Sequence, residues 1–225
     1  MERGRAYLRD SGNRRRYRAN AEVVVLSELN EQGSIVLIGP TGVGKSAVGT
    51  ELSKLLGWPL VELDDLRSQW YPEFGLDPEI EHRAMEQGGL RELVKAWKPY
   101  ELLSVERVMK ENPTNTVITF GGGQSVYVDP EQIQRAKEAL KVASRVILLL
   151  PTDHGQDSMR VLQDRLRKIP FVTDQPNPDE FLRAFSPILK MQLQSESNSQ
   201  LATEMIVTGY SSPQELAQHI HTTME

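Results

Sequence analysis

The residues with the most recognisable chemistry are Gly39, Gly44, Lys45 and Ser46, which form the pattern Gly-x-x-x-x-Gly-Lys-Ser within GPTGVGKSAV. Glycines at such places let backbone N–H groups turn toward an anion that a side chain would keep away. A loop of this kind, followed by the positive N-terminal end of a helix, binds nucleotide phosphates. We expect Lys45 to reach the β- and γ-phosphates and the Ser46 hydroxyl to ligate Mg²⁺. The expected nucleotide-binding residues of this loop are Gly39, Pro40, Thr41, Gly42, Val43, Gly44, Lys45, Ser46 and Ala47.

A second set of candidates is acidic, because the stretch VELDDL (61–66) supplies Glu62, Asp64 and Asp65. Side chains along a strand repeat every two residues, so Glu62 and Asp64 would point to the same face. One carboxylate could then face a metal ion and the next an acceptor hydroxyl. The alternative is that these acids only cap the helix that follows.

The class of nucleotide-using protein is narrowed by what the chain lacks. A switch GTPase would carry an NKxD segment, and a motor-type ATPase would carry an acidic pair at the end of a buried strand such as 145–150; the sequence has neither. The short chain and the acids after the phosphate loop favour a small-molecule kinase with ATP as donor.

The elements that must position these residues alternate between strands and helices, which predicts an α/β fold with a parallel sheet covered on both faces. The expected strands are the apolar runs 34–39, 59–63, 116–120, 145–150 and 204–208. The expected helices are 45–56, 78–111, 129–142, 156–167, 179–194 and 212–223, with an extra helix over 25–33. Loops are expected at 174–179 and 195–200.

Composition limits the partners and the compartment. The 225 residues carry a net charge of −5, but residues 1–18 hold seven arginines against two acids, a net +5 that leaves −10 for the rest. Such an acidic body argues against nucleic acid as the main partner, and we interpret residues 1–20 as a flexible basic arm. No apolar run is long enough for a membrane span, and the chain has no cysteine, so we expect a cytoplasmic protein without disulfides.

The ordered set of motifs resembles the shikimate kinase family over most of residues 33–222. It begins with GPTGVGKS and the Glu62-x-Asp64 pair, and it continues with EQGGLREL (86–93), VITFGGG (117–123), DRLRKIPF (164–171) and the terminal EMIVTGYSSPQELAQHI. The phosphate loop is shared by many enzymes, whereas the triple glycine after a strand, with these neighbours, is far more specific.

This resemblance implies a P-loop kinase fold. It would be a three-layer α/β/α sandwich with a central parallel sheet of about five strands and a mobile lid. A single domain would span 21–225, with an acceptor lobe at about 66–112 and the lid at about 153–178.

The resemblance also implies roles for individual residues. Asp64 would hold and deprotonate the acceptor hydroxyl, Glu62 would support Mg²⁺ through water, and Arg91 would pair with a substrate carboxylate. Catalytic arginines are expected at Arg165 or Arg167, with Arg160 as a further lid arginine at the nucleotide. The residues Gly121, Gly122 and Gly123 would let the backbone approach the acceptor. Arg91 as a surface residue, the glycines as a plain turn and the lid arginines as a solvated face are the alternatives.

Two departures from the family concern the acceptor side. Val94 stands where a glutamate is usual, and KMQLQSESNSQLA (190–202) lacks the arginine of the family's Arg-x-Pro-Leu-Tyr segment, for which Arg183 or Lys190 would have to compensate. We therefore expect a monomeric phosphotransferase acting on a small polar acceptor that need not be shikimate. The alternatives are a gluconate or nucleoside-monophosphate kinase and a non-catalytic nucleotide-binding protein.

Overall fold

The computed structural model describes residues 32–153 and 155–224. Gly33–Glu225 form one compact unit. The basic arm expected at 1–20 lies outside the described residues. So does the helix expected at 25–33, apart from Gln32 and Gly33, which are not helical.

A single parallel sheet lies at the centre of this unit. Its strands are β1 (Ile35–Ile38), β2 (Leu60–Glu62), β3 (Val117–Thr119), β4 (Arg145–Leu150) and β5 (Glu204–Val207). They follow the order β2-β3-β1-β4-β5, and every neighbouring pair is parallel. The five-stranded parallel sheet predicted from the sequence is confirmed. Because parallel strands end at the same edge, the residues that follow β1, β2 and β3 are brought together there.

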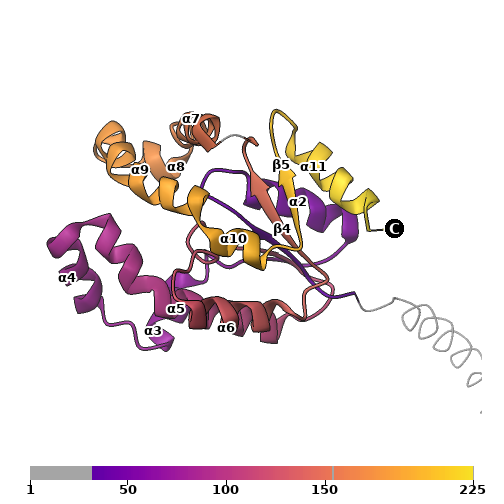
Figure 1. Ribbon diagram of the computed structural model, residues 1–225, viewed down its shortest axis with the longest axis horizontal. Coiled ribbons are helices and arrows are strands. Elements are labelled where there is room, and N and C mark those ends of the chain that lie inside the picture. The colour runs from indigo at the N-terminus through magenta and orange to yellow at the C-terminus, as the bar shows by residue number, and fades with distance from the viewer. Residues whose placement is uncertain (1–31, 154, 225) are drawn as a thin grey trace, which may run out of the picture. The chain divides into compact units, whose positions relative to one another are not determined.

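Helices cover both faces of the sheet, as Figure 1 shows. Ile35 and Leu37 of β1 pack with one apolar cluster, to which α2 (Lys45–Leu56), α7 (Gly155–Leu166), α9 (Pro178–Gln194) and α11 (Pro213–Thr222) contribute. Val36 and Ile38 point the other way, into a cluster built with α3 (Arg67–Glu73), α5 (Leu90–Glu111), α6 (Pro130–Leu140) and α10 (Glu196–Leu201). The alternation of side chains along one strand thus produces the predicted three-layer α/β/α arrangement.

The helices agree with the sequence where local signals are strong. Helix α2 has the expected bounds. Helix α6 begins after Asp129, whose side chain accepts a hydrogen bond from the Glu131 N–H at 2.9 Å. Ser212 and Glu215 form the expected capping box of α11.

Three expectations about helices were wrong. The helix expected over 78–111 is two helices, α4 (Pro78–Gly88) and α5, separated by Gly89 with φ 62°. The short helices α3 and α8 (Pro170–Thr173) were not expected. Residues 195–200 were expected as a loop, yet they form most of α10. Tertiary contacts hold this helix in place, because the buried Ser197 hydroxyl accepts from the Tyr127 N–H at 2.9 Å and donates to the Ser125 carbonyl at 2.7 Å.

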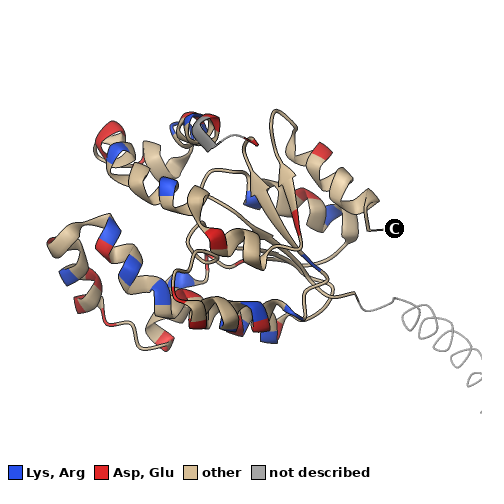
Figure 2. Ribbon diagram, viewed as in Figure 1, with Lys and Arg blue, Asp and Glu red and all other residues tan. Residues whose placement is uncertain are grey.

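The described surface mixes both signs of charge. In Figure 2, acidic and basic residues alternate along α5 and α6, and Arg135 of α6 binds Glu106 of α5 through two contacts of 2.8 Å. Within residues 32–153 and 155–224, none of the helices combines the length and apolar character needed to cross a membrane.

Candidate functional site

The phosphate loop lies between β1 and α2, at the carboxyl edge of the sheet. Gly39, Gly42 and Gly44 have φ values of 136°, 83° and 108°, a region that side chains other than glycine rarely adopt. A Cβ on Gly39 would also collide with the carbonyl oxygen of Leu149 on the neighbouring strand. The three glycines are therefore required by the path of the loop as well as by its proposed ligand.

Lys45, in the first turn of α2, points back into this loop. Its ammonium donates to the carbonyls of Gly39 at 2.9 Å and Pro40 at 3.0 Å. Burial lowers the pKa of Lys45 from 10.5 to about 8, and the negative charge of Asp64 partly opposes this shift. The ammonium is thus held at the centre of the loop and remains mostly charged near neutral pH, but it loses its proton at a lower pH than an exposed lysine does.

We expect ATP affinity to fall as the pH rises through about 8, because the neutral amine must then take up a proton before it can meet the phosphates. The loss should approach about tenfold per pH unit above the pKa. Calorimetric titration of Mg·ATP between about pH 7 and pH 9 measures how steeply the ATP affinity falls with pH. In the Lys45→Arg variant the side chain stays charged over this range, so the ATP affinity should depend much less on pH. An equally flat profile for the wild-type protein would contradict the depressed pKa.

A cavity of about 570 Å³ joins this loop to the candidate residues after β2 and β3. Glu62, Asp64 and Asp65 line it beside Lys45, as does the triple glycine. The sequence pattern predicted Glu62 and Asp64 on one strand, but β2 ends at Glu62 and Asp64 lies in the following turn. Both carboxylates still reach the same cavity, because the turn stays at the edge of the sheet.

The triple glycine follows β3 and forms the floor of the cavity. A Cβ on Gly121 would lie 2.5 Å from a carboxylate oxygen of Asp64, and one on Gly123 would lie 2.5 Å from Oε1 of Glu101. One on Gly122 would collide with the Thr41 hydroxyl and lie 2.8 Å from the Thr41 nitrogen. These glycines thus allow the phosphate loop, Asp64 and Glu101 to converge.

Gly122→Ala is expected to lower the free energy of unfolding by about 1–3 kcal/mol, the range for overpacking, and to weaken ATP binding because Thr41 must move. Urea unfolding and ATP titration measure the two effects. The matched control is Gly88→Ala at the end of α4, where the new methyl group meets the flexible side chain of Glu92. Equal stability of the two variants would contradict the close approach at Gly122.

The arginines expected in the lid lie outside the residues that line this cavity. The guanidinium of Arg165 donates to the carbonyls of Val43 at 3.1 Å and Gly209 at 2.8 Å, so it ties the phosphate loop to the loop after β5. Burial lowers its pKa. Arg160 and Arg167 are exposed and face Asp157 and Asp164 at 3.9 and 3.2 Å. Their catalytic roles stay predictions.

The cations expected on the acceptor side also lie away from this cavity. Arg91 is exposed on α5 and is not among the residues that line the cavity, whereas Leu90 and Val94 are. Arg183 and Lys190 are exposed on α9 and do not line it either. Residues 185–189 of α9, Phe-Ser-Pro-Ile-Leu, have the proline of the family's Arg-x-Pro-Leu-Tyr pattern with a phenylalanine in the arginine's place. This Phe185 lines the cavity.

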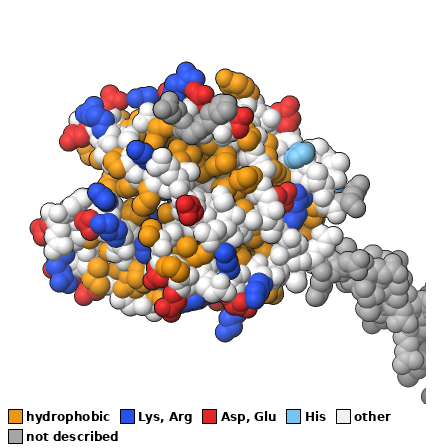
Figure 3. Space-filling view, viewed as in Figure 1, with side chains coloured by type: hydrophobic (Ala, Val, Ile, Leu, Met, Phe, Trp, Pro, Cys, Tyr) orange, Lys and Arg blue, Asp and Glu red, His pale blue; other side chains and the backbone are white. Residues whose placement is uncertain are grey.

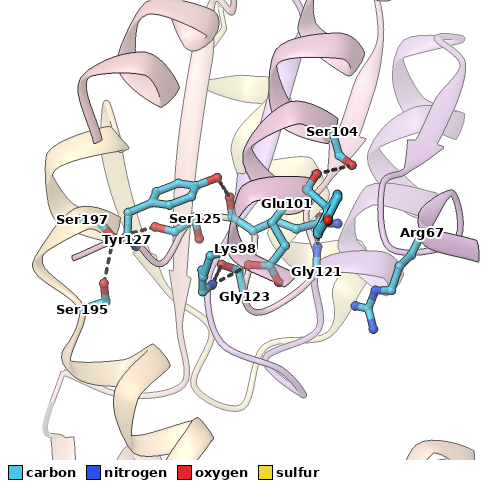
Figure 4. A network of polar contacts seen from close by, with 12 residues as sticks. Arg67, Lys98, Glu101, Ser104, Gly121, Gly123, Ser125, Tyr127, Ser195 and Ser197 are labelled. Atoms are coloured by element: carbon cyan, nitrogen blue, oxygen red, sulfur yellow. Dashed lines mark hydrogen bonds and ion pairs between the residues drawn. The ribbon is translucent and has the colours of Figure 1, made fainter. Parts of the chain in front are cut away.

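Among the lining residues that were not singled out from the sequence, Arg67, Glu101 and Gln192 make polar contacts that shape the site. Arg67 forms an ion pair with Asp64, and its guanidinium carbon lies 4.5 Å from the ring centroid of Trp97. Glu101 is only 2% exposed and forms a 2.5 Å ion pair with Lys98, whose ammonium also donates to the Gly123 carbonyl at 2.8 Å (Figure 4). Gln192 accepts from the Thr41 N–H at 2.9 Å and so joins α9 to the phosphate loop. The one sequence signal for Glu101 was the presence of a carboxylate among apolar residues of α5.

Comparison with known proteins gives two kinds of match. The chain is 31% identical over 141 residues to a shikimate kinase of Clostridium botulinum strain Loch Maree, covering 60% of this chain and 70% of that protein. It is 32% identical over 99 residues to the shikimate kinase of strain ATCC 19397, where it spans about half of the relative's length, 48%. No family model matches the chain.

Solved structures match over a larger part of the chain. A shikimate kinase from Acinetobacter baumannii in complex with shikimate has a TM-score of 0.53 at 22% identity, covering 86% of this chain and 93% of that one. A shikimate kinase from Aquifex aeolicus has a TM-score of 0.52 at 19% identity, covering 85% and 95%. At these identities the two structures show that the fold is shared.

Proposed function

The chain belongs to the shikimate kinase family, and from that premise we propose that it transfers the γ-phosphate of ATP to a hydroxyl group of a small molecule. One observation carries the proposal. The phosphate loop with Lys45, the acidic Asp64 and the triple glycine all line one cavity of about 570 Å³. Donor phosphates at the loop and an acceptor hydroxyl at Asp64 would therefore meet in the same space.

The proposed reaction is a direct displacement. The acceptor hydroxyl oxygen forms a bond to the γ-phosphorus, the bond from that phosphorus to the β,γ-bridging oxygen breaks, and ADP leaves. The hydroxyl proton passes to the carboxylate of Asp64. Lys45 offsets the negative charge on the transferring group, and Asp64 orients the acceptor, because phosphoryl transfer depends chiefly on positioning and charge neutralisation.

Mg²⁺ is the proposed metal. The Ser46 hydroxyl and the carboxylate of Glu62 line the cavity, and oxygen donors of this kind suit an ion that is held by few protein ligands together with phosphates and water. When bound there, the ion would neutralise part of the negative charge of the phosphates. The monomeric state and the cytoplasmic location expected from the sequence stay predictions.

A second recess, of about 240 Å³, is the proposed position of the nucleotide base. It lies behind the phosphate loop and is lined by Gly42, Gly44 and Arg165 together with Thr208 and Pro213. In this proposal, the half-buried Arg165 acts at the base side of the nucleotide rather than at the transferring phosphate.

Release of ADP from Mg·ATP, measured with and without shikimate, tests the proposed function. Turnover that depends on shikimate or on another hydroxylated acceptor supports it. A gluconate or nucleoside-monophosphate kinase would respond to its own acceptor instead. ATP binding without turnover on any acceptor of a broad alcohol panel would leave the third candidate, a non-catalytic nucleotide-binding protein.

A further inference from the structure

Two walls of the cavity are helix faces whose lining residues have the same spacing. One wall is a face of α5 whose members are spaced four, three and four residues apart: Leu90, Val94, Trp97 and Glu101. The other is a face of α9 with the same spacing: Phe181, Phe185, Ile188 and Gln192. This spacing puts each set on one side of its helix. Along the chain direction, both faces change from apolar to polar at their last member, so the cavity has a polar inner end and an apolar outer end.

The inner end is polar because both walls meet the triple glycine there. Gln192 lies against Gly122, and Glu101 lies against Gly123. Figure 4 shows Glu101 beside Lys98 and Gly123, with Arg67 on the opposite side of the group. Lys98 engages Oε2 of Glu101, and Oε1 on the side of Gly123 can accept a hydrogen bond from an acceptor hydroxyl. A hydroxylated head group fits this end.

The outer end is aromatic. Phe171, Phe181 and Phe185 pack together with ring centroids 5.2 to 5.9 Å apart, and Phe171 remains 42% exposed. Ile169 from the same side and Leu90 and Val94 from α5 complete an apolar lining, and Figure 3 shows hydrophobic side chains gathered along the recess between the two sides. Apolar surface of this kind is stabilised when a ligand covers it.

The charges that line the cavity do not suit an anionic acceptor. Among its described lining residues the cations are Lys45 and Arg67. Lys45 serves the phosphate loop, and Arg67 is paired with Asp64. The acids that line the same cavity are Glu62, Asp64, Asp65 and Glu101. A carboxylate at the outer end would lose its hydration against phenylalanine and valine without gaining a cation.

We propose, on the premise of the phosphotransferase function above, that the acceptor carries its hydroxyl groups on one end and an uncharged apolar ring or chain on the other. The hydroxyl end contacts Asp64 and Glu101, and the apolar end lies between the faces of α5 and α9. This class of acceptor differs from the small polar acid expected from the sequence, and it makes Glu101 and Phe185 specificity-determining residues.

The test compares shikimate with its butyl ester, which keeps every ring hydroxyl and exchanges the carboxylate for an uncharged apolar group. Calorimetric titration of each probe into the protein with Mg²⁺ and a non-hydrolysable ATP analogue measures binding independently of turnover. The ester should bind at least about tenfold tighter than the free acid. Equal or tighter binding of the free acid would overturn the proposal. Absence of ADP release with either probe would count against the phosphotransferase function alone, so the two failures are distinguishable.

Variants on α9 test whether the preference for the ester over the free acid arises at this wall of the cavity. Phe181→Arg, at a half-buried lining position, should reduce the ratio of ester to acid affinity by about tenfold, because it adds a cation at the outer end. Phe185→Arg should act more strongly where it folds, since this residue is 7% exposed. Ala184→Arg adds the same charge on the exposed side of α9 and should leave the ratio unchanged. An unchanged ratio in a folded Phe181→Arg protein would show that the acceptor does not lie between these walls.

Discussion

Asp64→Asn is expected to lower kcat by about 10²–10⁴-fold while changing the KM for ATP little, because the amide keeps the shape of the carboxylate but cannot take the acceptor proton. The change also removes the ion pair with Arg67, so the orientation of that guanidinium over Trp97 would loosen. Steady-state kinetics with the acceptor that supports turnover in the wild-type protein, followed by ADP release, measures the loss.

The matched control for Asp64 is its neighbour. Asp65→Asn removes the same charge from the lining of the same cavity at one residue's distance. Its kcat should stay within about threefold of the wild-type value, since of these two aspartates it is Asp64 that lies against Gly121 of the triple glycine. Similar losses in the two variants would mean that local negative charge, rather than the position of one carboxylate, supports turnover.

Lys45→Ala is expected to lower kcat/KM for ATP by about 10²–10³-fold, comparable to the loss of one preorganised donor at a site of developing charge. The substitution removes the cation and also leaves the carbonyls of Gly39 and Pro40 without their donor. Circular dichroism and thermal unfolding therefore accompany the kinetics, to separate loss of charge from loss of the loop.

Lys54→Ala is the control for Lys45. Lys54 lies in the last turn of the same helix, is exposed and pairs with Glu51 at 2.8 Å. Removing a surface pair of this kind should change kcat/KM by less than about twofold. A Lys45→Ala protein that is folded and within about tenfold of the wild-type activity would contradict the proposed role of the loop.

The strands could be predicted because each one is part of a parallel sheet covered by helices. A parallel strand in the middle of such a sheet needs a continuous apolar run, and runs such as RVILLL (145–150) have few alternative interpretations. The phosphate loop could be predicted equally well, because its glycines, its lysine and the start of α2 are adjacent in sequence. Function that depends on contiguous residues can be predicted from local pattern alone.

The acceptor side could not be predicted in this way, because its residues meet only in the folded chain. Gly88 and Gly89 were the sequence signal that 78–111 is two helices, yet the helical pattern on either side masked it. Arg91 was selected by resemblance, whereas the spacing of Leu90, Val94 and Glu101 determines which face of α5 lines the cavity. The ion pair of Arg67 with Asp64 depends on α3, a helix that the sequence did not indicate.

The apolar wall on α9 is continuous with the interior of the protein. Phe185 and Ile188 belong to the same buried cluster as Ile35 and Leu37 of the central strand, whereas Trp97 and Glu101 on the opposite wall lie outside it. Evolution toward a new acceptor would therefore be limited by packing to different degrees at the two walls of the cavity. Substitutions on α9, or at Leu90 and Val94 of α5, which pack against the same cluster, would change the acceptor at a cost in stability, whereas positions 97 and 101 are not constrained by this cluster. In lineages that descend from such a protein, acceptor choice should change first at positions 97 and 101.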